Sequence, residues 1–294
     1  MQVFKRIKWA WFDLLARIKF GASRPESVVL HGAPSPIFYN PADIRAVRHL
    51  VHGAVRGRVS TPAQFWRDAV AALQPDVALD VGANYGECFA TAHYEPQTRI
   101  VAIEANPSLI PYLEKTREKH QARDMIQLVN CIASDKHTKA QPFFYRPEWT
   151  GGGSAVVPEN TTGCSQATVD TRSIDGILSE NEGVKFGSLV LKIDTEGFEG
   201  HVFAGFKSIT KFKRVAGIIE FDTLYLSRAG TDPEQLFELL NAQFQLYDTD
   251  RRSTRLSRVR SWDHFHQGHE SKELHTDLVL VTSEKELPSA WTIG

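Results

Sequence analysis

The chain has few cysteines, no long apolar run and almost no net charge. Its three cysteines, Cys88, Cys131 and Cys164, form neither a C-x-x-C pair nor a Cys/His metal spacing, which is typical of a reducing cytosol. No run of about 18 apolar residues occurs, so no segment is predicted to span a membrane. With 34 basic and 35 acidic residues, the overall charge indicates no nucleic-acid partner. We therefore expect a cytoplasmic protein.

The length and the apolar content are sufficient for one large core. Of the 294 residues, 42% are apolar, and a chain of this size buries most of its apolar surface when it folds. We expect residues 61–294 to form one domain and residues 1–60 to form an N-terminal extension.

The first 20 residues mix apolar and basic side chains. They lack the uninterrupted apolar core and the cleavage site of a secretory signal. A basic helix rich in tryptophan can lie in a membrane interface. We favour a helix whose apolar stripe packs on the domain or on a second subunit. Peripheral contact with the inner face of a membrane and homo-oligomerisation both stay open. The apolar residues are Phe4, Ile7, Trp9, Trp11, Phe12, Leu14, Leu15 and Ile18, and the basic residues are Lys5, Arg6, Lys8, Arg17 and Lys19.

Two apolar runs end in acidic residues, as neighbouring strands of a nucleotide-binding sheet do. They read VALDVGANYG at Val77–Gly86 and VAIEANP at Val101–Pro107. Gly82 has no Cβ, so its backbone can approach a ligand, and the helix expected after the turn offers free N–H groups. Glu104 ends the second run, where an acidic residue accepts hydrogen bonds from ribose hydroxyls. Together with Asp80, these residues predict a nucleotide-type cofactor.

The spacing of the glycines distinguishes between cofactors. A dinucleotide fingerprint requires G-x-G-x-x-G, but Asn84 stands where the middle glycine should be. Asp80 would repel a pyrophosphate, whereas it could receive the ammonium group of a methionine moiety. Asn84 in place of glycine and the acidic side chain of Asp80 both disfavour NAD and FAD and favour S-adenosylmethionine.

From residue 61 onward, apolar runs alternate with helical patterns. This order predicts an α/β fold, in which a mostly parallel, Rossmann-like sheet has helices on both faces and a terminal antiparallel strand pair, the class I methyltransferase architecture. Residues 134–168 are expected to be irregular, with short strands at Phe143–Tyr145 and Ala167–Val169. The main strands are expected at Val77–Val81, Arg99–Glu104, Ile126–Ala133, Leu189–Asp194, Val215–Phe221, Phe244–Asp248 and Asp277–Thr282, and the main helices at Thr61–Leu73, Gly86–Tyr94, Ser108–His120, Ser173–Ser179, Glu199–Ile209 and from the capping segment Thr231–Glu234 to about Asn241.

A second cluster of charged residues lies in LVLKIDTEGFE, at Leu189–Glu199. An apolar strand ends here in Asp194, and Glu196 follows before the turn at Gly197. Ligands of open α/β sheets bind beyond the carboxyl ends of strands, near the point where the strand order reverses. We therefore expect Asp194 to face the reacting part of the cofactor and the acceptor. The alternative is that the acidic residues only cap the following helix.

Here the chain resembles the FkbM family of S-adenosylmethionine-dependent methyltransferases. The resemblance extends from about Pro75 to Asp248, and the K-I-D-x-E-G-x-E segment is its most specific part. The matching segments are Leu79–Gly86, Ala102–Pro107, Leu128–Asp135, Gly152–Val156, Val169–Leu178, Leu191–Gly205 and Ile218–Phe221.

The resemblance implies methyl transfer to an oxygen, commonly a hydroxyl of a sugar, a polysaccharide or a polyketide. It also implies roles for the matching positions. The methionine part would be held at Asp80, Gly82, Ala83, Asn84, Tyr85 and Gly86, the ribose and adenine at Glu104, Ala105, Asn106, Asn130, Ile132 and Ala133, and the reaction centre would lie at Asp194 and Glu196. Asp222 departs from the family, which often carries histidine at this position.

A hydroxyl acceptor needs a group that takes its proton. Asp194 is our first candidate for this general base, followed by Glu220 and Asp222. Alternatively, Asp194, Glu196 and either Glu220 or Asp222 could ligate Mg²⁺, which prefers oxygen ligands. We favour a site without a metal.

Two further segments are expected near the acceptor. Gly151–Ser154 is predicted to be a mobile loop that contacts substrate. The arginine-rich run Arg251–Arg260 suits a phosphate, a carboxylate or an anionic membrane, and the alternative is a solvated charge run. We expect a glycan acceptor, which would be free or lipid-linked. The alternatives are a polyketide or another small metabolite, and a non-catalytic pseudo-methyltransferase.

Overall fold

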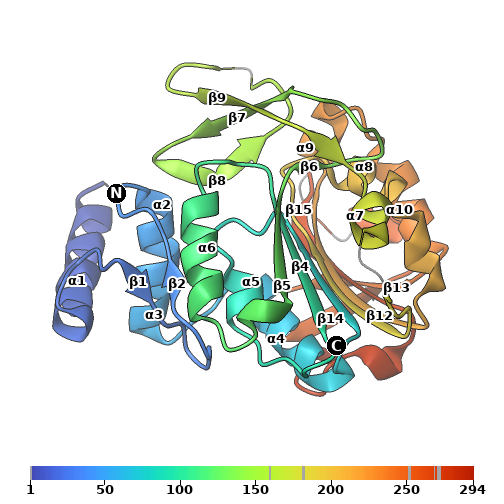
Figure 1. Cartoon of the computed structure of the whole chain (residues 1–294), viewed down its shortest axis with the longest axis horizontal. Coiled ribbons are helices and arrows are strands. Elements are labelled where there is room, and N and C mark those ends of the chain that lie inside the picture. The colour runs from blue at the N-terminus through green and yellow to red at the C-terminus, as the bar shows by residue number, and fades with distance from the viewer. Residues whose placement is uncertain (1, 159, 181–182, 251–252, 268, 270–272) are drawn as a thin grey trace.

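A central twisted sheet organises the chain (Figure 1). The computed structural model describes residues 2–294 except 159, 181–182, 251–252, 268 and 270–272. In order across the sheet, the strands are β16 (Thr292–Ile293), β14 (Arg255–Val259), β13 (Gln245–Thr249), β15 (His275–Val281), β12 (Arg214–Asp222), β11 (Ser188–Ile193), β3 (Val77–Val81), β4 (Arg99–Glu104) and β5 (Ile126–Asn130).

The predicted fold class is confirmed. Strands β12, β11, β3, β4 and β5 are parallel, and β15 inserts antiparallel between β12 and β13. Every residue of β3 and of β11 is buried, because helices cover both faces of these central strands. Their side chains alternate between the faces, so Ala78 belongs to one core and Leu79 to the other.

Helices lie on both faces of the sheet, as the sequence predicts. The N-terminal helices and α4, α5 and α6 contribute to one core, and α7, α8 and α10 to the other. The bounds are α4 (Thr61–Leu73), α5 (Glu87–Ala90), α6 (Ile110–Lys119), η2 (Arg123–Met125), α7 (Ile174–Ser179), α8 (Glu199–Ala204), η3 (Lys207–Lys211), α9 (Thr223–Arg228), α10 (Pro233–Asn241), α11 (Trp262–Gln267) and η4 (Glu284–Glu286).

The helix after β3 is much shorter than predicted. It was expected over Gly86–Tyr94, but α5 ends at Ala90. The Thr91 hydroxyl donates to the Cys88 carbonyl at 2.9 Å, so it takes up a carbonyl of the last turn. A helix of four residues has little macrodipole. The expected cofactor contact with free N–H groups at its start therefore loses its main support.

The region over residues 134–172 is more ordered than predicted. A three-stranded antiparallel sheet forms from β7 (Gln141–Arg146), β8 (Trp149–Ser154) and β9 (Ser165–Val169). The expected mobile loop Gly151–Ser154 is part of strand β8, which corrects that prediction. Gly153 is required there because a Cβ would lie 2.8 Å from the Phe143 ring. The short strands β6 (Ile132–Ala133) and β10 (Thr171–Arg172) pair beside this sheet.

The N-terminal residues form a group of helices at one end of the molecule (Figure 1). These are α1 (Gln2–Phe20), α2 (Ile44–Ala46), η1 (Val47–Val51) and α3 (His52–Arg56), with a small hairpin of β1 (Ser27–Val28) and β2 (Ile37–Phe38). The helix predicted in the first 20 residues is therefore confirmed. None of the helices in the described part of the chain is long and apolar enough to cross a membrane.

The arginine-rich segment is partly a strand. Arg251 and Arg252 lie outside the described residues, but β14 runs through the rest and buries Leu256 and Val259. Arg258 donates to Gln245 at the amino end of β13, which is opposite the end where the parallel strands deliver their acidic residues. The expected position of this run near the acceptor is therefore wrong for the described residues, and Arg255 and Arg260 are exposed, as the alternative of a solvated charge run predicts.

Candidate active site

A cavity of about 530 Å³ lies at the carboxyl ends of β3, β4, β11 and β12. Strands β3 and β11 are neighbours there, and the strand order reverses between them, which is where open α/β sheets bind ligands. The sequence-predicted residues that line the cavity are Asp80, Gly82, Ala83, Asn84, Tyr85, Glu104, Ala105, Ile132, Ala133, Asp194, Glu196 and Glu220.

The glycine turn after β3 is tied to β4. The N–H groups of Gly82 and Ala83 both donate to the Ile103 carbonyl at 2.9 Å. The Asn84 N–H donates to Glu104 Oε2 at 2.7 Å. The turn thus uses its N–H groups within the protein, so it does not form the open anion cradle that a pyrophosphate needs.

Gly82 is required for a different reason from the one predicted. Its φ of +76° suits glycine. A Cβ at this position would lie 1.8 Å from the Asp194 carbonyl oxygen. The missing side chain therefore lets the backbone after β11 cross close to the turn, and this contact joins the two halves of the cavity.

Glu104 is buried and held in place by the backbone. Its Oε1 accepts the Asn106 N–H and its Oε2 accepts the Asn84 N–H, each at 2.7 Å. Burial raises the pKa of Glu104, and these two hydrogen bonds oppose the rise. Each carboxylate oxygen has a second lone pair, so Glu104 can still accept hydrogen bonds from a vicinal diol in the cavity.

Three predicted cofactor residues lie behind the cavity wall rather than in it. The Asn130 side chain donates to the carbonyls of Glu104 and Ala105. Asn106 accepts from Ser108 and starts the turn before α6. Gly86 has a φ of +84° and takes the chain into α5. These residues shape the wall, which corrects the prediction that they contact the ligand.

Asp80 and Lys192 form a buried charged pair beneath the cavity. Neither Asp80 oxygen accepts a hydrogen bond from the described residues, and Lys192 Nζ lies 3.8 Å from Oδ1. Lys192 instead donates to the Gly82 carbonyl at 2.5 Å. Burial raises the pKa of Asp80 to about 6. A buried carboxylate without a hydrogen bond needs a cationic partner; Lys192 is one such partner, and a ligand ammonium group could be a second.

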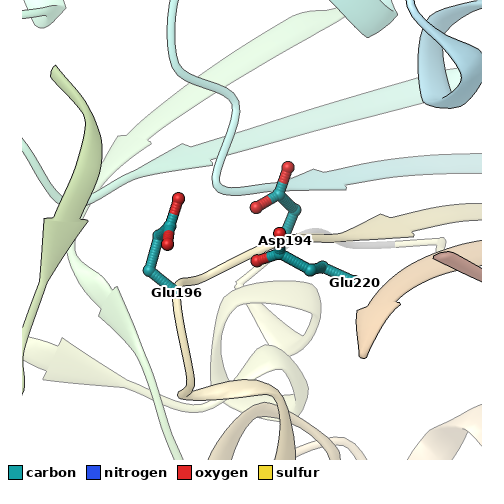
Figure 2. A group of neighbouring side chains, drawn as sticks. All are labelled: Asp194, Glu196 and Glu220. Atoms are coloured by element: carbon teal, nitrogen blue, oxygen red, sulfur yellow. The ribbon is translucent and has the colours of Figure 1, made fainter. Parts of the chain in front are cut away.

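Asp194, Glu196 and Glu220 bring their carboxylates together at the other side of the cavity (Figure 2). One oxygen from each lies within 4.8 Å of the others. Burial and the neighbouring carboxylates raise the pKa of Glu196 and of Glu220 well above the usual range. Lys192 Nζ lies 3.4 Å from Asp194 Oδ2. Three such oxygens could also hold a divalent cation.

The backbone at Glu196 is strained. Its φ of +52° lies in the left-handed region, which costs a residue with a Cβ on the order of 1 kcal/mol. Such strain persists where the surrounding structure determines it, often at functional sites. The strained turn keeps the Glu196 carboxylate close to Asp194 despite their repulsion.

The structure does not bring Asp222 into the cavity. Its Oδ1 accepts the N–H groups of Leu224 and Tyr225 at 2.9 Å, so it caps α9. Its Oδ2 lies 2.8 Å from His275 Nδ1. Because both oxygens are used in this way, we no longer regard Asp222 as a candidate base.

Part of the cavity wall comes from the N-terminal helices, which the sequence analysis missed. Asp43 caps α2, and its Oδ2 accepts from the Thr150 hydroxyl at 2.6 Å and from the Tyr85 hydroxyl at 3.2 Å. Arg45 stacks on Trp149, with Cζ 3.6 Å from the ring centroid. An aspartate before a helical segment is a common helix cap, so this role of Asp43 could be predicted from the sequence. Its hydrogen bonds to Tyr85 and Thr150 could not.

His49 and Glu87 form an ion pair in the same wall. Their Nε2 and Oε2 atoms lie 2.7 Å apart. Glu87 raises the pKa of His49. His49 in turn lowers the pKa of Glu87, although burial opposes this effect. Both residues line the cavity, and the Asp194 carboxylate also raises the pKa of His49.

The resemblance noted in the sequence is confirmed by comparison with known families. Residues 80–247 match the model of the methyltransferase FkbM domain. No curated protein matches the chain.

Three similar solved structures share little sequence identity with this chain. Methyltransferase FkbM from Methylobacillus flagellatus is 15% identical with a TM-score of 0.41, and the match covers 95% of this chain and 60% of that one. The chain therefore spans less than two thirds of that relative. An O-methyltransferase from Bacillus cereus in complex with SAH is 11% identical, with coverages of 75% and 80% and a TM-score of 0.39. An O-methyltransferase from Thermotoga maritima is 11% identical, with coverages of 74% and 63% and a TM-score of 0.35.

Proposed function

The chain belongs to the FkbM methyltransferase domain family, and on this premise we propose that it is an S-adenosylmethionine-dependent O-methyltransferase. We propose a hydroxyl of a sugar or cell-surface glycan as its acceptor. The observation that carries the proposal is the division of one cavity between a diol-binding carboxylate, Glu104, and a group of carboxylates that can take a proton.

The cofactor half of the cavity fits S-adenosylmethionine. Asp80 would receive the ammonium group, because its buried oxygens lack hydrogen bonds from the described residues. Glu104 would accept from the two ribose hydroxyls, and Ile132 and Ala133 would line the adenine side. When bound, the cofactor supplies a methyl group on a positively charged sulfur. The turn at Gly82 offers no open phosphate cradle, which disfavours a dinucleotide in this half.

The acidic half supports transfer to oxygen. We assign Asp194 as the first acceptor of the hydroxyl proton, because its side chain is 38% exposed and lines the cavity. As the acceptor oxygen gains the methyl group, its proton moves to the Asp194 carboxylate. Glu220 lies close enough to share that proton, and its raised pKa favours holding it.

The cavity wall also supports a sugar acceptor. Trp149 is 42% exposed and lines the cavity. Aromatic rings provide apolar faces for sugar rings. Arg45 stacks on this ring and carries donors that suit hydroxyl, carboxylate or phosphate oxygens.

The test is a methyl-transfer assay with S-adenosylmethionine and a panel of free and lipid-linked glycans, polyketide-like alcohols and amines. We expect S-adenosylhomocysteine to form with a glycan, and turnover to be lost in Asp194→Asn. Turnover on amines alone would contradict transfer to oxygen, and turnover on the apolar alcohols alone would contradict the glycan. Cofactor binding without turnover on any acceptor would favour a pseudo-enzyme.

A further inference from the structure

Helix α1 packs on the protein through one of its faces. Ala16 is fully buried. The rings of Trp9 and Phe12 stack on His52 of α3, with centroid distances of 5.3 and 5.2 Å. Asp13 completes this contact through a 3.2 Å bond to His52. The helix is therefore fixed to the N-terminal helices.

The opposite face of α1 is apolar and exposed. Trp11, Leu14 and Ile18 are 57%, 48% and 74% exposed. Their spacing of three and four residues places them in one stripe along the helix. Large apolar side chains gathered in one stripe normally have a partner. The described residues place none on this stripe, because all three side chains remain exposed.

The charge of α1 indicates what kind of surface would cover the stripe. Its sequence QVFKRIKWAWFDLLARIKF contains five basic residues and one acidic residue, whereas the whole chain has a net charge of −1. The single acidic residue, Asp13, is hydrogen-bonded to His52 on the packed side of the helix. A second copy of α1 would bring like charges together, whereas an anionic surface would attract them.

We propose that α1 docks the protein on an anionic lipid surface, with Trp11, Leu14 and Ile18 entering the interface. A tryptophan and aliphatic residues on one face of a basic helix are suited to this position, in which the helix lies in the membrane plane. Exposed Arg17, beside Ile18, would lie at the level of the lipid headgroups.

The docking helix α1 is connected to the cavity wall through α3, η1 and α2. It contacts α3, and α3 follows directly from η1 and α2, which carry His49 and Arg45 in the cavity wall. Docking would therefore hold this wall at the lipid surface. The proposal does not depend on the proposed methyl transfer, because vesicle binding is measured without cofactor or acceptor.

The test is flotation of the full chain with vesicles of phosphatidylcholine alone, and with vesicles in which part of it is replaced by phosphatidylglycerol. We compare the wild type with the triple variant Trp11→Ser/Leu14→Ser/Ile18→Ser. Leu239→Ser on α10, where Leu239 is similarly exposed, serves as the matched control. All changes are at exposed positions, so thermal unfolding should verify that each variant folds.

We expect the wild type and the control to float with the anionic vesicles. The partition coefficient of the triple variant should fall at least about tenfold, given the cost of losing three apolar groups from the interface. Arg17→Glu should weaken binding by roughly fivefold or more, because one basic residue near an anionic surface contributes about that factor. Higher salt should weaken the binding of the wild type and of the control to anionic vesicles.

Three results would overturn the proposal. The first is no flotation of the wild type with anionic vesicles. The second is equal flotation of the wild type and the triple variant. The third is a dimer in light scattering that becomes a monomer in the triple variant without any vesicle binding, because the stripe would then be an interface between copies of the chain.

Discussion

The carboxylates in the two halves of the cavity have opposite environments. At the ends of β3 and β4, Glu104 accepts two backbone N–H groups and is fixed before any ligand arrives. At the ends of β11 and β12, Asp194, Glu196 and Glu220 lie close together with few such bonds, and a Glu220 oxygen is buried without one. The first half is ordered for binding, whereas the second holds unfavourable charge.

We propose the roles of the two halves from this difference. A carboxylate fixed by the backbone loses little entropy when it binds a diol, so it contributes to affinity. Carboxylates that repel one another bind protons more readily, so they are suited to take one from a hydroxyl. Lys192 lies between the halves, since it contacts Asp194, approaches Asp80 and donates to the Gly82 carbonyl.

The largest effect is expected from Asp194→Asn. The amide cannot take the hydroxyl proton, so kcat should fall by about 10²–10⁴-fold. The affinity for S-adenosylmethionine, measured by calorimetry, should change little because Asp194 belongs to the acidic half. Asp124→Asn, outside the cavity and with a side chain that is 93% exposed, is the matched control. Near-wild-type kcat in Asp194→Asn would show that the base is elsewhere.

The next effect is expected from Glu104→Gln, which tests the other half. An amide nitrogen would face one of the two N–H groups that Glu104 now accepts, and it would also bind a diol less well. We expect cofactor affinity to fall by about 10–100-fold, or about 1.4–2.7 kcal/mol. At saturating cofactor, kcat should stay near the wild-type value. Unchanged affinity would remove Glu104 from the ribose site.

A smaller effect, on stability, is expected from Glu220→Gln. The pKa of Glu220 is raised in the folded protein, so the folded state binds more protons than the unfolded state above the usual glutamate pKa. The free energy of unfolding therefore decreases as the pH rises through this window. Glutamine does not titrate, so the variant should be more stable than the wild type near neutral pH.

The pH dependence is the decisive part of this prediction. The stability difference between Glu220→Gln and the wild type should shrink as the pH falls towards the usual glutamate pKa. Thermal unfolding of the cofactor-free proteins across this range gives the comparison. A difference that does not vary with pH would mean that repulsion in the acidic half is not its cause.

The smallest effect is expected from a chelator. We propose that the acidic half works without a metal, because the Lys192 ammonium already lies beside Asp194. Adding EDTA to the methyl-transfer assay should leave kcat unchanged. A loss that Mg²⁺ restores would instead assign Asp194, Glu196 and Glu220 as its ligands.

The central strands could be predicted well because their chemistry is local. The short apolar runs Val77–Val81 and Leu189–Asp194, each with an aspartate at or near its end, predict strands, and the structure has buried strands at Val77–Val81 and Ser188–Ile193. The position of Asp194 beside the glycine turn follows from parallel strands that end at one edge of the sheet. Strand β8 was missed because three successive glycines are unfavourable in a strand, and here the Phe143 ring occupies the space of a Cβ.

The rest of the cavity depends on contacts between distant residues. Asp43 and Thr150 are separated by 107 positions in the sequence. Their hydrogen bond fixes the N-terminal helices over the cavity, and no local pattern indicates it. Asp222 shows the opposite error, since its position after a strand predicts a general base, whereas its geometry is that of a helix cap.

The most direct test of the account is a calorimetric titration of the wild-type chain with S-adenosylmethionine, with NAD as the comparison ligand. We predict saturable binding of S-adenosylmethionine and no binding of NAD, since Asp80 favours an ammonium group and the Gly82 turn offers no phosphate cradle. Binding of NAD, or no binding of S-adenosylmethionine by the folded protein, would contradict the assignment of the cofactor half.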